Sequence, residues 1–316
     1  MTTSHPSAAL PPNLHVFERG WLSSNNILFI DDVDSASLVD TGYVSHRVQT
    51  LGLVRSRLDG RRLTRIFNTH LHSDHCGGNA YLQQETGARI AIPPGLAKAV
   101  ARWDEDELTF RATGQQCDRF GYDALIEPGT TLRLGEGEWQ ALAAPGHDPH
   151  SIMLWNVKDR VLISADALWQ HGFGGIFPEI EGESGFAEQA AMLDLIEQLQ
   201  PRVVIPGHGA PFLDVDAALG RARQRLAALS ADPARNARQV AKALIKFYLL
   251  DVRSLPLDRL VRHLSGARYF LVINERYFRR PFDQLIEQIV RELAAVGAAE
   301  LTGGVVANRD HATAAE

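Results

Sequence analysis

The sequence predicts a layered α/β fold with one polar site at the edge of a β-sheet. Short runs rich in β-branched and aromatic residues, such as 26–30 and 202–205, are typical of buried strands. Between the strands lie segments with apolar residues at helical spacing, such as 45–58 and 186–200. Four of the predicted strands end in turns that carry histidine or aspartate, and sites of layered α/β folds lie on such loops.

The composition is that of a globular protein. The chain has 316 residues, 45% hydrophobic and 22% charged, which is enough for one large domain and a smaller one. The net charge of −6 argues against a general nucleic-acid binder. Two cysteines indicate no disulfide framework. We find neither a signal-peptide pattern nor an apolar run of about 18 residues, so we expect a cytoplasmic protein that does not contact a membrane.

Charge is distributed unevenly along the chain. Residues 1–220 hold 16 Lys+Arg against 28 Asp+Glu, whereas residues 221–316 hold 16 against 10. The first part therefore has a balance of −12 and the second a balance of +6. This asymmetry indicates a second module of different character. We predict two domains, over 14–215 and 216–316.

The first half of the chain begins with predicted strands over 14–17 and 26–30. A third predicted strand ends at Asp40, for which two roles are open. Asp40 could cap the following helix, or it could orient a ligand histidine through a hydrogen bond. A short buried strand over 63–69 leads into the densest group of polar residues in the chain.

Residues 70–75 place three histidines and one aspartate within six positions. Imidazole nitrogen and carboxylate oxygen suit zinc or a similar divalent ion. The Gly77-Gly78 pair that follows predicts a turn into a helix, and Cys76 is best explained as a small buried residue. The potential metal ligands of this segment are His70, His72, Asp74 and His75.

Residues 96–125 predict no regular element. They contain several aromatic residues and the acidic run 104–107, which is typical of a solvated surface. A lid insertion over the site is the alternative. Residues 130–134 and 138–142 then predict a hairpin.

Three further predicted strands end in ligand-type residues. His147 follows a glycine turn, Asp166 follows the predicted strand 160–164, and His208 lies in a Gly-His-Gly turn. A single histidine after a strand carries little information, because most such residues have structural roles. Four strand ends of this kind on one chain predict a single site at one edge of a sheet.

The C-terminal segment predicts helices followed by a hairpin. After a linking helix over 216–230, helical spacing recurs at 236–251, 257–264 and 282–295, and a hairpin forms about Thr302-Gly303. Three helices and a hairpin resemble a winged helix. The module could cover the rim of the site, dimerise or bind nucleic acid, and its diffuse positive charge argues against nucleic acid. Three of its basic residues could also contact an anionic substrate tail. These are Arg276, Arg279 and Arg280.

The order and spacing of these motifs resemble the metallo-β-lactamase-fold hydrolase superfamily over roughly residues 14–215. The matching motifs are His-x-His-x-Asp-His at 70–75, Gly-His at 147, Asp166, Gly-His-Gly at 208 and Val-Asp-Thr-Gly at 39–42. The resemblance implies an αββα sandwich, in which two mixed sheets are flanked by helices. The presence of both Asp74 and Asp166 resembles the glyoxalase II and lactonase branches more than true β-lactamases.

The resemblance also implies two divalent metal ions, for which we expect zinc, with iron or manganese as alternatives. It implies a hydroxide that bridges the ions and attacks the substrate, with Asp74 placed to orient it and to carry its proton. The implied ligands are His70, His72 and His147 for the first ion and Asp74, His75 and His208 for the second, with Asp166 bridging the two.

We therefore predict a dinuclear hydrolase of a small carbonyl substrate, namely a thioester, lactone or related ester. The alternatives are a nuclease or phosphodiesterase that uses the basic C-terminal module, a β-lactamase, and a metal-stabilised binding protein without activity. Trp169 stands where quorum-signal lactonases carry tyrosine, which weakens the case for a lactone. Three residues near the motifs are candidates to support the ligands or to contact substrate. These are Asp40, Trp169 and His171.

Overall fold

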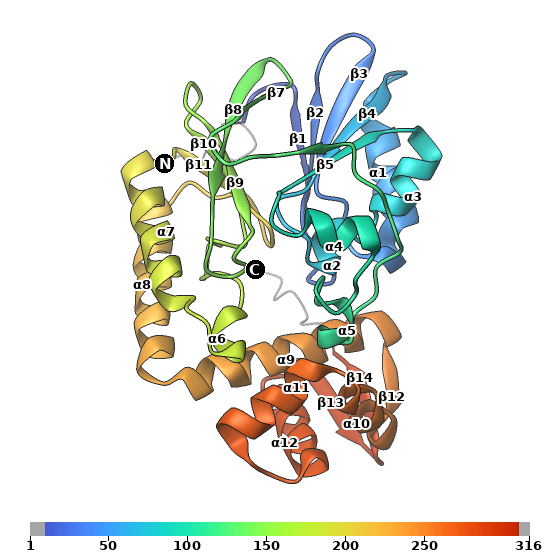
Figure 1. Cartoon of the computed structure of the whole chain (residues 1–316), viewed down its shortest axis with the longest axis vertical. Helices are drawn as coiled ribbons and strands as arrows, with labels where there is room; N and C mark the ends of the chain where they lie inside the picture. Colours follow the sequence, from blue (N-terminus) through green and yellow to red (C-terminus); the bar gives the residue numbers. More distant parts are fainter. Residues whose placement is uncertain (1–9, 310–316) are drawn as a thin grey trace.

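The structure is a computed structural model that describes residues 10–309. Two β-sheets lie face to face, helices cover both outer faces, and a mainly helical module closes one end (Figure 1). The predicted αββα sandwich is therefore confirmed. No helix among the described residues has both the length and the apolar character needed to cross a bilayer.

The first sheet has six strands in the order β1-β2-β3-β4-β5-β6 within the described residues. Pairing is antiparallel from β1 to β3 and parallel from β3 to β6, so the sheet is mixed. The strands are β1 (Leu14–Phe17), β2 (Asn26–Ile30), β3 (Ser35–Val39), β4 (Arg62–Phe67), β5 (Arg89–Ile92) and β6 (Ala124–Leu125).

The second sheet has the order β11-β10-β9-β8-β7, with five strands in the part of the chain that is described. Its pairs are antiparallel except for β10 and β11, which run parallel. The parallel pair matters for function, because both strands then end at the same edge of the sheet. The strands are β7 (Thr131–Leu134), β8 (Gly137–Ala143), β9 (Ile152–Asn156), β10 (Val161–Ala165) and β11 (Val203–Pro206).

The space between the sheets is filled by apolar side chains from both of them. Phe29 and Phe67 from the first sheet meet Trp139, Leu154 and Ile205 from the second. The rings of Phe29 and Trp139 pack edge to face with centroids 5.2 Å apart. Full burial of one such side chain contributes roughly 1.5–3 kcal/mol to folding, so this layer holds the strand ends in a fixed relation.

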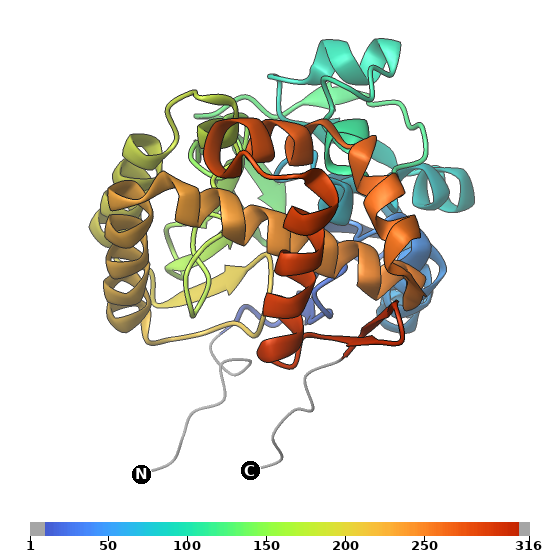
Figure 2. The same ribbon diagram turned by 90° about the horizontal axis from the view of Figure 1, so that it is seen from below.

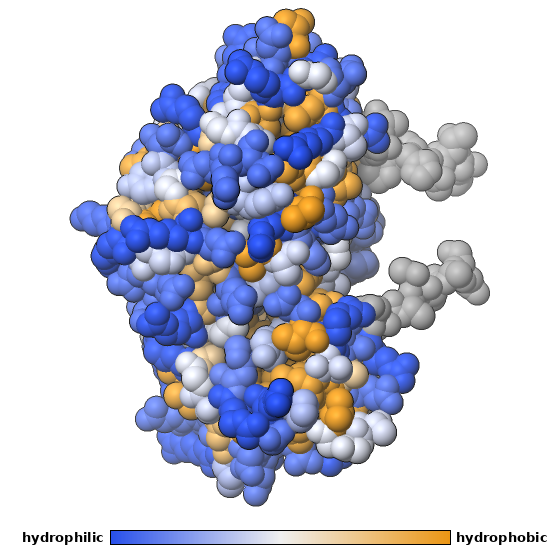
Figure 3. All heavy atoms as spheres, turned by 90° about the vertical axis from the view of Figure 1, so that its right-hand side faces the viewer, coloured by the Kyte–Doolittle hydropathy of each residue, from blue (hydrophilic) through white to orange (hydrophobic). Residues whose placement is uncertain are grey.

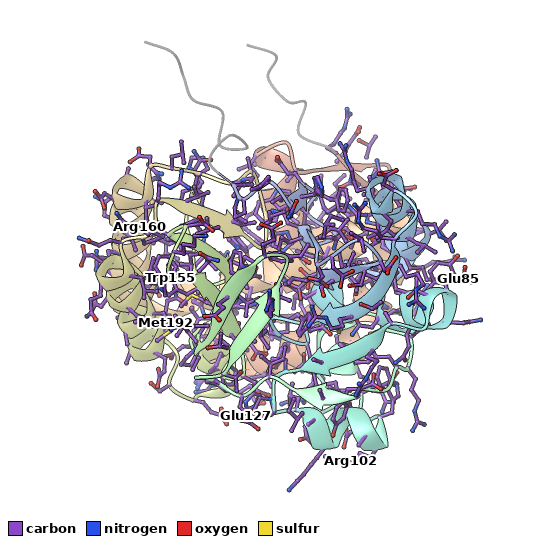
Figure 4. All side chains as sticks on the ribbon, turned by 90° about the horizontal axis from the view of Figure 1, so that it is seen from above. Glu85, Arg102, Glu127, Trp155, Arg160 and Met192 are labelled. Atoms are coloured by element: carbon purple, nitrogen blue, oxygen red, sulfur yellow. The ribbon has the colours of Figure 1, made fainter. Side chains whose placement is uncertain are left out.

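Helices cover the outer face of each sheet. The first sheet is covered by α1 (Arg47–Leu58), α3 (Asn79–Thr86) and α4 (Ala97–Arg102), and the second by α7 (Phe186–Leu199) and α8 (Val215–Ala231). Seen from above, Trp155 and Met192 lie on the side of the second sheet, where they share one apolar cluster, and Glu85 and Arg102 lie at the far edge (Figure 4). On the face that carries α1 and α3, hydrophilic side chains dominate and hydrophobic ones are scattered among them (Figure 3).

The segment 96–125, predicted to be irregular, contains three short elements. These are α4, α5 (Phe110–Thr113) and β6. The acidic run at 104–107 forms ion pairs with two arginines of the same segment, Arg102 and Arg111. Elements of two to six residues are too short to show a hydrophobic period, which is why the sequence did not predict them.

The C-terminal module consists of a long helix, further helices and a small sheet. Helix α9 (Pro233–Val252) crosses beneath the sandwich, and α12 (Phe282–Ala295) packs on its outer side (Figure 2). The rest comprises α10 (Leu257–Ser265), α11 (Arg268–Ile273), a π-helix η3 (Asn274–Phe278), and a sheet of β12 (Ser254–Pro256), β14 (Val305–Asn308) and β13 (Ala299–Thr302) in that order.

The structure therefore contains α11, η3 and β12 in addition to the predicted helices and hairpin. The winged-helix resemblance and the domain boundary between 215 and 216 stay predictions. The module packs directly on the sandwich, because Phe247 and Leu250 of α9 contact a small apolar cluster of the first sheet's loops. This cluster consists of Leu22, Tyr43 and Val44.

Candidate metal centre

The seven predicted ligands meet at one edge of the sandwich, where strand ends from both sheets converge. The loop after β4 carries residues 70–76 and contains the short helix α2 (Ser73–Cys76). The loop between β8 and β9 carries His147, the end of β10 carries Asp166, and the end of β11 carries His208. Ligands so distant in sequence come together because the sheet packing fixes the positions of these strand ends.

The imidazole group consists of His70, His72 and His147. The Nδ1 atom of His72 lies 3.1 Å from Nε2 of His70 and 2.9 Å from Nε2 of His147. His147 donates from Nδ1 to the carbonyl of Gly175 at 2.6 Å, so its Nε2 presents a lone pair to the cavity. Two nitrogens on one tetrahedral zinc ion are about 3.3 Å apart, so these spacings are those of a ligand set.

The carboxylate group consists of Asp74, His75 and His208. Oδ2 of Asp74 lies 3.1 Å from Nε2 of His208 and 3.8 Å from Nε2 of His75. Nδ1 of His75 lies 2.7 Å from Oδ2 of Asp40, which fixes the ring. Nε2 of His75 is buried and has no hydrogen-bond partner among the described residues. A buried polar atom without a partner is costly, and a cation at this point would satisfy it.

Asp166 lies between the two groups. Its Oδ1 is 3.4 Å from Nε2 of His75 and its Oδ2 is 3.4 Å from Nε2 of His147. Each carboxylate oxygen therefore faces one group. Trp169 donates from Nε1 to Oδ1 of Asp166 at 3.2 Å and helps to fix the carboxylate.

The two groups differ in charge. Burial, together with neighbouring imidazoles, lowers the pKa of His70 well below its usual value and the pKa of His147 to about 4. Burial alone would also lower the pKa of His75, but Asp40, Asp166 and Asp74 around it raise that pKa well above its usual value. His70 and His147 are thus neutral, whereas the carboxylate group is surrounded by negative charge.

The residues present fit divalent cations. Buried carboxylates are stable only when opposite charge is close, and the field that raises the pKa of His75 is the field that attracts a metal ion. Ligand atoms in each group lie within 4.8 Å of one another, and thiolate ligands are absent from these groups. Imidazole and carboxylate ligands admit zinc, iron or manganese. Cys76 is buried, with its Sγ 3.9 Å from that of Cys117, and belongs to neither group.

Asp40 supports the site and does not cap a helix. Its side chain accepts hydrogen bonds from the backbone and hydroxyl of Thr69, at 2.9 and 2.8 Å, as well as from His75. The backbone at Asp40 has a positive φ of 57°, a conformation that costs energy for a residue with a side chain and is found at functional sites.

Two residues near the ligands were not predicted. Asp148 is buried and places Oδ2 3.5 Å from Nε2 of His72, on the side of the ring away from the other ligands. Asp148 directly follows the Gly146-His147 turn, and this position is the sequence feature that could have identified it. Trp21 is 51% exposed, and its ring stacks on His208 at 5.3 Å with planes 12° apart. It precedes β2, and no sequence signal placed it near the site.

The structure does not bring His171 to the site. A tight turn joins Trp169 and Gly172, with a hydrogen bond of 2.6 Å from Trp169 N to Gly172 O. His171 lies at the tip of this turn and is exposed, and it is not part of the cavity lining. His171 was predicted to support the ligands or to contact substrate because it is close to Asp166 in the sequence. The tight turn leaves its side chain exposed and outside the cavity.

Two glycines allow the ligands to approach the backbone. A Cβ atom at Gly174 would lie 2.3 Å from Nδ1 of His147, and one at Gly207 would lie 2.2 Å from Oδ1 of Asp166. Both distances are far below van der Waals contact, so a side chain at either position would displace a ligand.

A cavity of about 330 Å³ opens over the ligands. Its walls include aromatic residues from several loops and apolar residues of α9. The segment 96–125 reaches the cavity through Thr113 and Gln115. Gln115 accepts a hydrogen bond from the hydroxyl of Ser73, which lies in the sequence between the ligands His72 and Asp74. The aromatic lining residues are Trp21, Trp169, Phe173, Phe177 and Phe247.

Comparison with known proteins agrees with this arrangement. A family model described as the metallo-beta-lactamase superfamily matches residues 19–208. The hydroxyacylglutathione hydrolase of Methylococcus capsulatus is 31% identical over 140 residues, which cover 44% of this chain and 45% of that protein. The hydroxyacylglutathione hydrolase of Rhizobium etli is 26% identical over 174 residues, 55% of each protein. The chain thus spans about half the length of these relatives.

The shorter hydroxyacylglutathione hydrolase GloC of Haemophilus influenzae is 26% identical over 212 residues, covering 63% of this chain and 91% of that protein. Two solved structures share the fold over almost the whole chain. A beta-lactamase domain protein from Burkholderia ambifaria covers 98% of this chain and 97% of its own, with TM-score 0.57 and 21% identity. A metallo-beta-lactamase family protein from Thermus thermophilus covers 95% and 99%, with TM-score 0.54 and 20% identity.

Proposed function

Because the chain belongs to the metallo-beta-lactamase superfamily, we propose that it is a metal-dependent hydrolase of a small thioester or related ester. The observation that carries this proposal is the convergence of the imidazole group, the carboxylate group and Asp166 at the base of one cavity. The relatives named above are hydrolases of hydroxyacylglutathione, which is a thioester.

The imidazole group and the carboxylate group would each hold one divalent ion, with Asp166 between them. Ions bound there supply Lewis acidity, which polarises a carbonyl oxygen and lowers the pKa of water. Zinc suits these ligands best, with iron and manganese as alternatives.

Asp74 is the residue that we assign to proton transfer. Burial alone would raise the pKa of its carboxyl group, but His75 and His208 lower it, so the group is ionised and accepts hydrogen bonds. An ionised carboxylate at the base of the cavity can orient an attacking water molecule and accept its proton. Trp169 and Asp40 act through the ligands, by fixing Asp166 and His75.

The cavity favours a small molecule over a polymer. A volume of about 330 Å³ matches a small ligand, and the aromatic walls suit an apolar acyl group. Helix α9 lines this cavity through Val240, Leu244 and Phe247, which leaves less room for a nucleic-acid strand than an open groove would. Asp166 between the groups favours an ester or thioester over a β-lactam, following the resemblance to glyoxalase II.

The test is a panel of thioesters, esters and lactones assayed with metal-loaded protein. We expect thioester hydrolysis that falls roughly 100- to 10,000-fold in Asp74→Asn, because proton transfer contributes that much to hydrolysis. Asp59→Asn is the control, since Asp59 is exposed at the end of α1. Metal content is measured in all three proteins. Full activity in Asp74→Asn with unchanged metal, or no hydrolysis by metal-loaded wild type, would reject the proposal.

A further inference from the structure

The cavity carries positive charge that the metal ligands do not explain. Arg225 of α8 and two lysines of α9, Lys242 and Lys246, line it together with apolar residues. A cation in an apolar wall is costly unless its charge is matched. The contacts of these three side chains therefore show which of them has charge left to offer a ligand.

The two lysines are engaged within the protein, Lys242 by a carboxylate and Lys246 by hydrogen bonds that use all three of its N–H donors. Lys242 forms an ion pair of 2.8 Å with Glu292 of α12. Lys246 donates to Oδ1 of Asn308 at 2.6 Å and to the carbonyls of Ala298 and Arg309, both at 2.7 Å. Both side chains therefore tie α9 to the rest of the C-terminal module.

Arg225 has a different environment. It donates from Nη1 to the carbonyl of Phe173 at 2.8 Å and from Nη2 to Oε1 of Gln239 at 3.1 Å, and its guanidinium lies over the Phe173 ring at 4.7 Å. Both acceptors are neutral. Among residues 10–309 it forms no ion pair with an acidic side chain, in contrast to Arg223 two positions earlier, which pairs with Asp194 and Glu197.

The charge of Arg225 is thus held in place without a counter-charge. Burial lowers the pKa of its guanidinium, which reports the cost of removing that charge from water. A guanidinium has five N–H donors in a fixed fork, and the hydrogen bonds to Phe173 and Gln239 use only part of them. Arg225 lines the cavity, and its remaining donors form no hydrogen bond to another residue within 10–309.

We propose that Arg225 binds an oxyanion of the substrate, a carboxylate or a phosphate, and so makes the enzyme selective for anionic substrates. This inference rests on the proposed hydrolase function and names its substrate class. The ester bond lies at the metal ligands, the apolar part contacts the aromatic walls, and the anionic group pairs with Arg225. The fork of the guanidinium matches either oxyanion, often through two hydrogen bonds.

A purely structural role is the competing explanation, because Arg225 also braces the loop after β10 through the Phe173 carbonyl. Arg221 offers a matched control. It lies one turn earlier on α8 and braces the same loop by donating from Nε to the carbonyl of Gln170 at 2.9 Å. Arg221 does not line the cavity.

The first measurement is calorimetric binding of ligands that cannot be hydrolysed. The probes are 3-(propylthio)propionate, its neutral amide, and 2-(propylthio)ethyl phosphate, each titrated into metal-loaded protein. We expect wild type to bind an anion about 10- to 100-fold more tightly than the amide, because charge-assisted hydrogen bonds contribute effects of this size. The tighter of the two anions identifies the group as carboxylate or phosphate.

The preference for the anion should disappear in Arg225→Gln, remain in part in Arg225→Lys and persist in Arg221→Gln. Coordination of the anion by metal would leave the preference intact in Arg225→Gln, and that result overturns the proposal. Equal weakening of anion and amide in Arg225→Gln would show that Arg225 only braces the loop, which also overturns it. Melting temperatures verify that each variant is folded, and Arg225→Lys keeps the test valid if Arg225→Gln does not fold.

Turnover separates this inference from the proposed function. The substrates are the S-acetyl thioesters of 3-mercaptopropionate, which is anionic, and of 2-mercaptoethanol, which is neutral. Hydrolysis of both with a ratio of kcat/KM that Arg225→Gln leaves unchanged overturns the role of Arg225 and leaves the hydrolase intact. Hydrolysis of neither by wild type rejects the proposed function, whereas the binding preference still decides whether Arg225 recognises an anion.

Discussion

The imidazole group and the carboxylate group share one cavity and one intervening aspartate, yet they differ in the charge that they present to a cation. In the imidazole group, burial holds the pKa of His70 and His147 low, so these two rings present neutral nitrogens. The carboxylate group presents negative charge, and this charge raises the pKa of His75. A neutral set binds a metal through directed lone pairs alone, whereas the charged set adds Coulomb attraction.

The groups also differ in how they are supported. Asp40 contacts His75 at 2.7 Å and is itself held by Thr69, whereas Asp148 lies 3.5 Å from His72. The supporting aspartate is thus close in the carboxylate group and more distant in the imidazole group. The two sites should differ in affinity, and each should respond to its own variants.

The largest effect is expected from removing one ligand of each group. His147→Ala should lose the ion of the imidazole group and His208→Ala that of the carboxylate group, each leaving about one metal per chain. Activity should fall by on the order of 100-fold or more, since even residues that only support ligands cost about 10–100-fold. Elemental analysis and thioester turnover measure both quantities. His171→Ala is the control, and two retained metals in either ligand variant would contradict the assignment.

A smaller and more selective effect is expected from the supporting aspartates. Asp40→Asn should weaken metal binding by about 10–100-fold at the carboxylate group, because it disturbs the hydrogen bond that fixes His75. Asp148→Asn should weaken metal binding at the imidazole group by less, because the contact between Asp148 and His72 is longer. Competition with a chromogenic chelator resolves the two steps of metal loss. An Asp148→Asn effect as large as that of Asp40→Asn would remove this distinction.

The smallest effect concerns the pH dependence of stability in metal-free protein. The pKa of His147 is lowered to about 4, so its neutral form stabilises the fold above pH 6.5, and this stability is lost as pH falls from 6.5 towards 4. The pKa of His75 is raised, so its charged form stabilises the fold at low pH, and this stability is lost as pH rises through the folded pKa.

Thermal unfolding of chelator-treated protein between pH 5 and 9 tests these opposite signs. In His147→Gln, Tm should fall less as the pH is lowered, and in His75→Gln it should fall less as the pH is raised. Each difference should be roughly 2–4 °C, which corresponds to about 1 kcal/mol in the free energy of unfolding. Identical pH profiles in the two variants would show that the groups do not differ electrostatically.

Local patterns predicted much of this molecule. The strands at 14–17 and 26–30 and the ligand turns were visible because strand length, apolar composition and a following glycine are properties of neighbouring residues. The structure brings all seven predicted ligands together. The elements missed include α4, α5 and β6 in the segment 96–125 and α11, η3 and β12 in the C-terminal module, all of which are too short to show a period.

Residues that reach the site through tertiary packing were not predictable in this way. Trp21 precedes a strand and Arg225 lies on a helix, and neither carries a local motif. The three basic residues suggested from sequence for an anionic tail, Arg276, Arg279 and Arg280, are not part of the cavity lining, and Arg276 donates to the carbonyl of Ile180. The prediction for His171 was wrong for the opposite reason. His171 is close to Asp166 in the sequence, but the tight turn between Trp169 and Gly172 keeps it away from the cavity.

Gly174 and Gly207 have a consequence for how relatives of this chain should be recognised. A protein with alanine at either position would retain every ligand of both metal groups and would still match the His-x-His-x-Asp-His pattern. Its Cβ atom would nevertheless occupy the space now taken by His147 Nδ1 or Asp166 Oδ1. Such a protein would satisfy the motif with His147 or Asp166 displaced from its present position, so the motif alone does not specify this arrangement of ligands.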